Sequence, residues 1–310
     1  MKVLITGCCG FIGRYLIDLV SQQGYAPFGL DLNPAAPTGI TSDHYFCTSG
    51  TAELCAIVEK VQPDLCVHAA GQASVPGSFE NPEKDFTGGP ALTFAILDAL
   101  RQFAPKCRLI FLSSASVYGQ PGQLPISEAQ PLAPMSPYGF HKWQSEILLR
   151  EFHEIFGLNT ACVRIFSAYG IGLRRQVLWD ICRRIISEGE LILRGTGQES
   201  RDFINVHDVA SGILTVAQNA PARGEAYNLS SGIETTISEL ANIAVSALDE
   251  SVVPAFDGTV SVGDPLNWRA DVSAIQALGF KHETNLQDGV AAYALWCKEQ
   301  IRADHGGGDR

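Results

Sequence analysis

The chain of 310 residues is 46% apolar and carries a formal net charge of −11 at pH 7. This length and composition predict a soluble globular protein with one large core, or one core and a smaller lobe. The negative charge argues against a broad surface for nucleic acid or anionic membrane. No apolar run approaches the roughly 20 residues that cross a bilayer, and Met1-Lys2 leads directly into an apolar strand. We therefore expect a cytoplasmic protein that binds neither nucleic acid nor membrane.

A glycine-spaced turn follows the first apolar run of the chain. Residues 6–13 read Thr-Gly-Cys-Cys-Gly-Phe-Ile-Gly, directly after Val3-Leu4-Ile5. Gly7 permits the tight turn, Gly10 lets the backbone approach a pyrophosphate, and Gly13 lets the following helix pack closely on the strand. The N-terminus of that helix supplies N–H donors and a partial positive charge. The turn therefore predicts a dinucleotide-binding site.

The next apolar strand ends in an acidic residue, Asp31. It follows the glycine turn by about 20 residues, the separation at which dinucleotide-binding folds place a carboxylate on the adenosine ribose. A carboxylate accepts hydrogen bonds from the ribose hydroxyls and repels a 2′-phosphate, and no Lys or Arg lies between Leu32 and Glu59 to neutralise one. NAD is therefore favoured over NADP, with Arg14 as the one residue that argues otherwise.

The nine cysteines include no Cys-x-x-Cys pair and no His at metal-ligand spacing. Several, such as Cys66 and Cys162, lie in apolar runs, as is typical of reduced, buried thiols, so we predict no metal site and no disulfide. Cys8-Cys9 is a vicinal pair beside a helix N-terminus, where a thiol can have a lowered pKa and be oxidised. For this pair we favour filling of the turn by small residues over a redox role.

Strand-like and helix-like segments alternate through the first half of the chain. This rhythm predicts an α/β protein with a doubly wound parallel Rossmann sheet, in which ligands collect at the carboxyl ends of the strands. The expected strands are Val3–Thr6, Ala26–Leu30, Leu65–Ala69, Arg108–Leu112 and Thr160–Ile165. The expected helices are Ile12–Gln23, Thr51–Val61, Pro90–Phe103 and His141–Phe156.

Shorter elements, punctuated by Gly and Pro, follow Gly170 and predict a smaller C-terminal α/β lobe for substrate. We expect residues 1–169 to form the NAD-binding domain, with 203–228 rejoining it. The substrate lobe then consists of 170–202 and 229–302. The glycine-rich end, 303–310, is expected to be a disordered tail.

Tyr138 and Lys142 lie four apart at the start of a helix that Ser136-Pro137 announces, so both side chains fall on one helix face. An unperturbed tyrosine titrates at about pH 10. Because a neighbouring ammonium favours the phenolate, Lys142 is expected to lower the pKa of Tyr138. The hydroxyl residues Ser113, Ser114 and Ser116 lie at the end of an upstream strand, where they can hydrogen-bond a substrate oxygen whose proton is moving.

Several further motifs occur in one order along nearly the whole chain. They are His68-Ala69-Ala70-Gly71-Gln72-Ala73-Ser74-Val75, Ser113 to Gly119, Arg164 to Gly170, Arg201 to Val206, and Tyr227-Asn228-Leu229. With the glycine turn and Tyr-x-x-x-Lys, they make the chain resemble the extended short-chain dehydrogenases/reductases. Within these it is most similar to the NAD-dependent nucleotide-sugar epimerase/dehydratase family, which includes 4-epimerases and 4-keto-6-deoxy sugar nucleotide reductases.

The resemblance implies a role for each matching position. Tyr138 would be the acid/base, Lys142 its electrostatic partner and a ligand of the nicotinamide ribose, and Ser114 the hydroxyl beside the sugar O4. The cofactor-binding residues would be Gly7, Gly10, Phe11, Ile12, Gly13, Asp31, Leu32, Ala69, Ala70, Gly71, Tyr138 and Lys142. The residues that bind the nucleotide-diphosphate sugar would be Ser74, Val75, Ser114, Ser116 and Ser167, together with Arg201 and Arg269, which would hold the diphosphate. The family also implies a homodimer formed through helices 90–103 and 141–156.

Some positions depart from the family pattern. Residues 46–49 stand where the third strand usually ends in an aspartate that reads adenine, and Gly89 stands where an asparagine is common. Ser167 and Ile171 replace the usual Asn and Pro. The run Gly88-Gly89-Pro90 predicts that its helix begins late.

These motifs are compatible with more than one function. We predict a 4-epimerase, in which NAD takes hydride from hexose C4 while Tyr138 removes the O4 proton, and hydride returns to the other face of a 4-keto intermediate. The alternative is an NAD(P)H-dependent reductase of a 4-keto-6-deoxy sugar nucleotide, which the departures at Gly89 and Ser167 favour. A non-catalytic NAD sensor is a third possibility. The presence of Ser114, Tyr138 and Lys142 together argues against it. A 4,6-dehydratase is disfavoured because Ala115-Ser116 stands in place of the Asp-Glu pair that the elimination needs.

Overall fold

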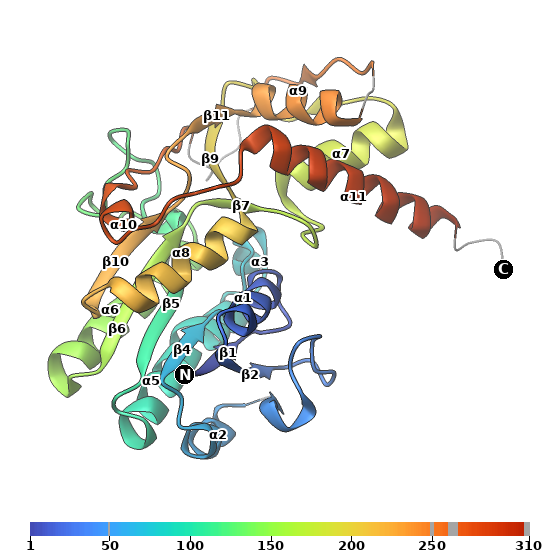
Figure 1. The fold of residues 1–310 in the computed structure, drawn as a ribbon. Coiled ribbons are helices and arrows are strands. Elements are labelled where there is room, and N and C mark those ends of the chain that lie inside the picture. The colour runs from blue at the N-terminus through green and yellow to red at the C-terminus, as the bar shows by residue number, and fades with distance from the viewer. Residues whose placement is uncertain (49, 249–250, 260–265, 307–310) are drawn as a thin grey trace.

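A seven-stranded sheet with helices on both faces dominates the structure, a computed structural model that describes residues 1–48, 50–248, 251–259 and 266–306 (Figure 1). Its strands are β1 (Lys2–Thr6), β2 (Ala26–Asp31), β3 (Tyr45–Cys47), β4 (Leu65–His68), β5 (Arg108–Ser114), β6 (Asn159–Ile165) and β10 (Arg223–Leu229). They lie in the order β10-β6-β5-β4-β1-β2-β3 and all pair in parallel. The predicted doubly wound α/β sheet is confirmed. Because the strand order reverses between β1 and β4, the crevice for a ligand is expected beyond the carboxyl ends of these two strands.

Two groups of helices cover the two faces of this sheet. One face carries α1 (Phe11–Gln22), α8 (Val206–Asn219) and α10 (Ser273–Ala277), and the other carries α2 (Leu54–Val61), α5 (Leu92–Phe103) and α6 (Pro137–Phe156). Side chains alternate between the faces, so Val3 and Ile5 of β1 pack toward α1 and α8, whereas Leu4 packs toward α2 and α5. Burial on both faces explains why these strands read as continuous apolar runs.

A smaller lobe packs beyond the carboxyl end of the sheet, at the top of Figure 1. Its strands are β7 (Ser167–Tyr169), β9 (Ser200–Asn205) and β11 (Glu234–Thr236) in one sheet, with β8 (Ile192–Leu193) and β12 (Ala255–Phe256) in a second. Its helices are α7 (Gln176–Glu188), α9 (Ile237–Leu248) and α11 (Leu286–Gly306). These three helices share a separate apolar core with β9. No helix in the described part of the chain is long and apolar enough to cross a membrane.

The structure differs from the predicted elements in a few places. The short strand β3 is missing from the strands expected from apolar runs, although the family resemblance placed the end of a third strand at 46–49, and α6 begins at Pro137 rather than at His141. The expected late start at Gly88-Gly89-Pro90 is wrong: α4 (Pro82–Phe86) continues through a π-helical turn, Thr87–Ala91, into α5. Pro90 has no N–H to donate, and two glycines ease the wide turn, so the helix passes through. The predicted tail, 303–310, falls partly on α11, and 307–310 lie outside the described residues.

A buried ion pair ties α6 to the sheet. The Arg164 guanidinium on β6 donates to Glu146 on α6 through Nη2 at 2.7 Å and Nε at 3.0 Å, and both side chains are less than 10% exposed. Ser113 of β5 donates to the same carboxylate at 2.6 Å. The remaining Arg164 Nη1 donates to the Tyr118 hydroxyl, which in turn donates to Asn228 of β10. The network joins α6 to three neighbouring strands.

Breaking this pair is expected to destabilise the fold strongly. Glu146→Ala leaves the Arg164 guanidinium buried without its carboxylate, so the free energy of unfolding should fall by about 3–5 kcal/mol. Urea denaturation followed by circular dichroism measures this loss. Glu188→Ala removes the exposed partner of Arg183 and should cost less than about 1 kcal/mol. Equal losses in the two variants would contradict an anchoring role for the buried pair.

Candidate active site

The glycine turn between β1 and α1 lies at the point where the strand order reverses. Gly7 has φ +68°, and a Cβ built on it would lie 2.7 Å from the backbone nitrogen of Ala70. A Cβ on Gly13 would lie 2.4 Å from the carbonyl oxygen of Gly7. Only glycine fits either position, so the turn brings backbone N–H groups to the carboxyl edge of the sheet with no side chain in the way. Gly10 is the N-cap of α1, so Phe11 and Ile12 form its first turn.

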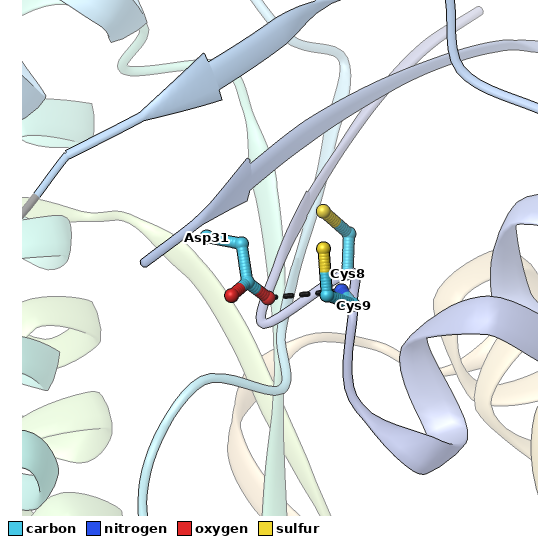
Figure 2. A group of neighbouring side chains, drawn as sticks. All are labelled: Cys8, Cys9 and Asp31. Atoms are coloured by element: carbon cyan, nitrogen blue, oxygen red, sulfur yellow. Dashed lines mark hydrogen bonds between the residues drawn. The ribbon is translucent and has the colours of Figure 1, made fainter. Parts of the chain in front are cut away.

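Asp31 closes the same crevice from the end of β2. One carboxylate oxygen accepts from the Cys9 backbone N–H at 2.9 Å and the other from the Asn33 N–H at 3.1 Å. The next residue, Leu32, is 73% exposed. Figure 2 shows that the Asp31 carboxylate points toward the glycine turn, where the Cys8 and Cys9 side chains lie.

The segment after β4 forms the opposite wall. Ala69 N–H donates to the Thr6 carbonyl at 3.2 Å and Ala70 N–H to the Thr6 hydroxyl at 3.1 Å, which holds the end of β4 against the end of β1. Gly71 has φ +132°. His68 lies beneath them, buried between the hydroxyls of Thr6 at 2.8 Å and Thr93 at 3.1 Å. Burial and the Lys142 ammonium lower the pKa of His68 to about 3, so this imidazole is neutral.

Ser114, Tyr138 and Lys142 come together beside this crevice. Ser114 ends β5, and the other two stand one turn apart at the start of α6. Ser136 caps the helix by accepting from the Gly139 N–H, and Ser78 of α3 (Val75–Glu80) accepts from the Tyr138 N–H at 3.1 Å. The structure thus places the three predicted catalytic side chains where the main sheet meets the second lobe.

Burial governs the electrostatics of Tyr138. Removal of the ring from water raises the pKa of its phenol above the usual value, while a hydrogen bond with Ser114 opposes the increase and Asp85 adds to it. The expected lowering by Lys142 is not found. The Lys142 ammonium donates to the Leu112 carbonyl at 2.7 Å and lies 5.7 Å from the centroid of the Tyr138 ring. Because burial lowers the pKa of Lys142 to about 8, below the raised pKa of the phenol, the ammonium has lost its proton by the pH at which Tyr138 ionises.

Burial also makes Lys142 easier to deprotonate than a lysine in water. Desolvation lowers the pKa of its ammonium to about 8, and the nearby carboxylates of Asp85 and Glu146 limit the decrease. The ammonium also stands over the face of Phe111, 4.6 Å from the ring centroid, where the ring quadrupole favours a cation. Lys142 is thus held at the sheet edge by a carbonyl, an aromatic ring and two carboxylates.

Sequence reasoning missed Asp85 and His141. Asp85 of α4 is 3% exposed and pairs with His141 Nδ1 at 2.5 Å. Both residues line a cavity of about 10 Å³, enough for a single water, together with Ala70, Gly71, Gln72, Gly89, Phe111, Tyr138 and Lys142. The spacing of apolar residues does not distinguish Asp85 from the other charged residues of this short helix. Asp85 stands out because it is buried, and its burial depends on the packing of α4 against α6.

The predicted substrate residues line several segments around the same edge. Ser74 is the N-cap of α3, which begins at Val75, and Ser167 begins β7. Ser116 donates its N–H to the Ser114 hydroxyl at 3.2 Å. Within the described residues, the Ser116 hydroxyl oxygen is one of the buried side-chain atoms that lack a hydrogen-bond partner.

Arg201 and Arg269 lie on adjacent backbone segments of the second lobe. The Trp268 N–H donates to the Ser200 carbonyl, so the segment that contains Arg269 runs beside β9. The Arg201 guanidinium donates to the Ser200 carbonyl at 2.8 Å and stands over the Trp268 ring. A larger cavity of about 660 Å³ opens elsewhere in this lobe, between β11, α9 and residues 282–287, and none of the predicted site residues lines it.

The residues present fit a bound dinucleotide. The backbone cradle at Gly7 would be filled by any Cβ, the helix N-terminus at Gly10 favours a pyrophosphate, and Asp31 has a carboxylate at the position that suits ribose hydroxyls. NAD therefore fits these residues, with Ala69, Ala70 and Gly71 as the facing wall.

Comparisons with known proteins agree with this geometry. The family model described as "NAD dependent epimerase/dehydratase family" matches residues 3–230. The chain belongs to this family. Among curated members, it is similar to a UDP-glucose 4-epimerase of Mycolicibacterium smegmatis, with 29% identity over 94% of this chain and 96% of that protein. It is also similar to a putative UDP-glucose 4-epimerase of Methanocaldococcus jannaschii, with 28% identity over 97% and 99% of the two chains.

Solved structures of similar proteins share the fold over nearly the full chain. MoeE5 in complex with UDP-glucose and NAD superposes with a TM-score of 0.87 at 26% identity, covering 97% of this chain and 100% of MoeE5. A UDP-glucose 4-epimerase of Thermotoga maritima with UDP-glucose also has a TM-score of 0.87, at 23% identity over 97% and 100% of the two chains. The family fold thus extends through both lobes.

The close approach at Gly7 leads to a test with a matched control. Gly7→Ala forces a Cβ against the Ala70 backbone, so we expect a loss of cofactor binding and a lower melting temperature. Gly24→Ala has the same left-handed strain, at φ +72°, but no atom within 4 Å of the new Cβ. Thermal denaturation and quenching of tryptophan fluorescence by NAD would compare the two variants. A loss of the same size in both would show that backbone strain alone matters.

The Asp85 carboxylate supports the positive charge of Lys142. Asp85→Asn should therefore lower the pKa of Lys142 further below about 8, so that the ammonium loses its proton at a lower pH. A pH titration of lysine side chains by NMR, with Lys142→Met used for assignment, measures the change. Glu83→Gln, on the exposed side of the same helix, should leave the pKa of Lys142 unchanged. An unchanged or higher pKa in Asp85→Asn would contradict this assignment.

Proposed function

We propose that this protein is an NAD-dependent 4-epimerase of a UDP-linked hexose that acts through a 4-keto intermediate. The observation that carries the proposal is the meeting of Ser114, Tyr138 and Lys142 beside a glycine turn and the Asp31 carboxylate, at the reversal of strand order. The curated relatives named as UDP-glucose 4-epimerases support this reaction, and the MoeE5 complex supports both ligands.

The chain's own residues would hold the cofactor along the carboxyl edge of the sheet. The backbone of Gly10, Phe11 and Ile12 would receive the pyrophosphate, and Asp31 would accept hydrogen bonds from the adenosine ribose. Lys142 would donate to the nicotinamide ribose. When bound, NAD supplies reversible hydride transfer at a carbon that bears a hydroxyl.

Tyr138 would transfer the proton of the sugar hydroxyl, and Ser114 would position that hydroxyl. The Tyr138 phenolate takes the proton from O4 as the C4–O4 bond becomes a carbonyl, and the phenol returns that proton to O4 when the alcohol re-forms. Ser114, which already hydrogen-bonds the phenol, would hold O4 in line with it. Because burial raises the pKa of the phenol, the phenolate is a strong base once formed.

The second lobe would hold the diphosphate and sugar. Arg201 and Arg269 lie on neighbouring segments of that lobe, and guanidinium groups bind paired phosphate oxygens with two parallel hydrogen bonds. The Ser116 hydroxyl, buried near Ser114, would hydrogen-bond the sugar. Together with Ser74, Val75 and Ser167, these residues form the proposed substrate side of the cleft, and residues 1–169 form the proposed NAD-binding domain.

A homodimer is a further part of the proposal. The exposed faces of α5 and α6 carry Phe94, Phe140 and Ile147, each more than 40% exposed, and adjacent exposed apolar residues are typical of protein contacts. Ile147→Lys should therefore convert a dimer to a monomer in light scattering. Leu295→Lys, at an exposed leucine of α11 outside the proposed interface, should leave the dimer intact. A monomeric wild-type chain would contradict the dimer. A cytoplasmic location stays a prediction.

Replacement of the phenol tests the proposed reaction. Tyr138→Phe should lower turnover of a UDP-hexose by about 100- to 10,000-fold, because the proton on O4 loses its acceptor, while NAD affinity remains within a few-fold. Tyr25→Phe, remote from the site, should keep full activity. Product chromatography with UDP-hexoses and catalytic NAD measures both variants. Retained turnover in Tyr138→Phe would overturn the role of this residue.

The same assay separates the epimerase from the reductase. We expect isomer formation with no net change in nicotinamide absorbance when a UDP-hexose is supplied. Stoichiometric consumption of NADH or NADPH with a 4-keto-6-deoxy sugar nucleotide, and no isomerisation, would instead establish the reductase.

A further inference from the structure

Two thiols and a carboxylate gather at the adenosine end of the proposed cofactor cleft. The sulfur atoms of Cys8 and Cys9 and a carboxylate oxygen of Asp31 all lie within 4.8 Å of one another. Figure 2 shows the three side chains where the turn after β1 meets the end of β2. Cys8 is buried, whereas Cys9 and Asp31 are partly exposed, so the cluster is reachable from solvent on one side. The prediction of no metal site rested on spacing in the sequence, and the fold adds Asp31 to the vicinal pair.

The surrounding backbone holds this cluster in place. The Cys9 N–H donates to the Asp31 carboxylate at 2.9 Å, which fixes the turn relative to β2. The Cys8 side chain extends over Gly29, where a Cβ would lie 2.7 Å from its sulfur. The absence of a side chain at position 29 therefore makes room for the Cys8 sulfur beside the other two groups. Cys9 also contacts the Tyr45 hydroxyl and the Ala35 carbonyl through its sulfur, at 3.6 and 3.7 Å.

We propose that Cys8, Cys9 and Asp31 form a site for a thiophilic divalent cation, with zinc as the expected metal, and that metal and NAD exclude each other. Two thiolates and one carboxylate match the ligands that zinc takes in proteins, with a fourth position open to solvent. Each thiol that ligates the cation releases its proton. Burial and the neighbouring Cys9 and Asp31 raise the pKa of the Cys8 thiol, so the positive charge of the cation is what would favour its thiolate.

Exclusion follows from the shared carboxylate. Asp31 already accepts from the Cys9 and Asn33 N–H groups, one on each oxygen, so the cation and the ribose hydroxyls of NAD compete for the lone pairs that remain. This half of the inference rests on the proposed function, whereas the metal site itself does not. By reciprocity, NAD should weaken the metal by the factor by which the metal weakens NAD.

Cobalt(II) gives a direct test because thiolate ligation produces a charge-transfer band in the near ultraviolet. We expect the reduced wild-type chain, with NAD removed, to bind one equivalent of Co²⁺ with this band, and Zn²⁺ to displace it. NAD at 100 times its own dissociation constant should raise the apparent metal dissociation constant about 100-fold. Separate titration of the metal-free chain with NADH, followed by fluorescence, establishes whether the cofactor binds at all.

The variants isolate each ligand. Cys8→Ser and Cys9→Ser should each reduce the band and weaken the metal at least tenfold, and Asp31→Asn should weaken it with the band retained. Cys47→Ser, at an exposed thiol on the neighbouring strand, should leave the band and the metal affinity unchanged, and circular dichroism verifies that all variants fold.

No band in the wild-type chain, or an unchanged band in Cys9→Ser, overturns the site. A band that NAD does not weaken, in a chain that binds NADH, overturns the exclusion. Failure of NADH to bind counts against the proposed function and leaves the metal site standing.

Discussion

The position of α6 depends on one buried ion pair. Glu146 lies four residues beyond Lys142 and eight beyond Tyr138 on the same helix, and its carboxylate is held by Arg164 of β6 and Ser113 of β5. A buried pair gains little net stability over an apolar contact, but loss of one partner leaves a charge in a low-dielectric interior. Sliding α6 along the sheet would impose that penalty. We infer that the pair sets the register of the helix and, through it, the place of both catalytic side chains relative to Ser114.

Local patterns predicted the parts of the structure that depend on neighbours in sequence. The glycine turn, Asp31 at the end of β2 and the four-residue spacing of Tyr138 and Lys142 each occur within one turn or strand, and the structure brings them to one edge of the sheet as expected. The short strand β3 has only three residues, too few to show the alternation of apolar and polar side chains that predicts a strand. The pairing of Asp85 with His141 joins residues 56 apart, and no local pattern contains that contact.

The pKa values in the site show why the spacing of residues along the sequence does not determine how they ionise. Spacing indicated that Lys142 would promote ionisation of Tyr138, but a lysine does so only while it keeps its own charge. In the structure, burial lowers the pKa of Lys142 to about 8, and the loss of water around the phenol dominates the pKa of Tyr138. Desolvation of this kind is a property of the packed molecule.

His68 links this packing to the behaviour of the whole protein in acid. Its imidazole is enclosed by two threonine hydroxyls under the cofactor cleft and has a pKa of about 3 in the fold, against 6.5 when unperturbed. Between these values the unfolded chain binds a proton that the folded chain does not, so stability is full above about pH 6.5 and declines as the pH falls toward 3. A proton added to His68 in acid would place a positive charge at the buried junction of β1 and β4, near the Lys142 ammonium. Part of the sensitivity of this protein to acid therefore originates directly under the cofactor crevice.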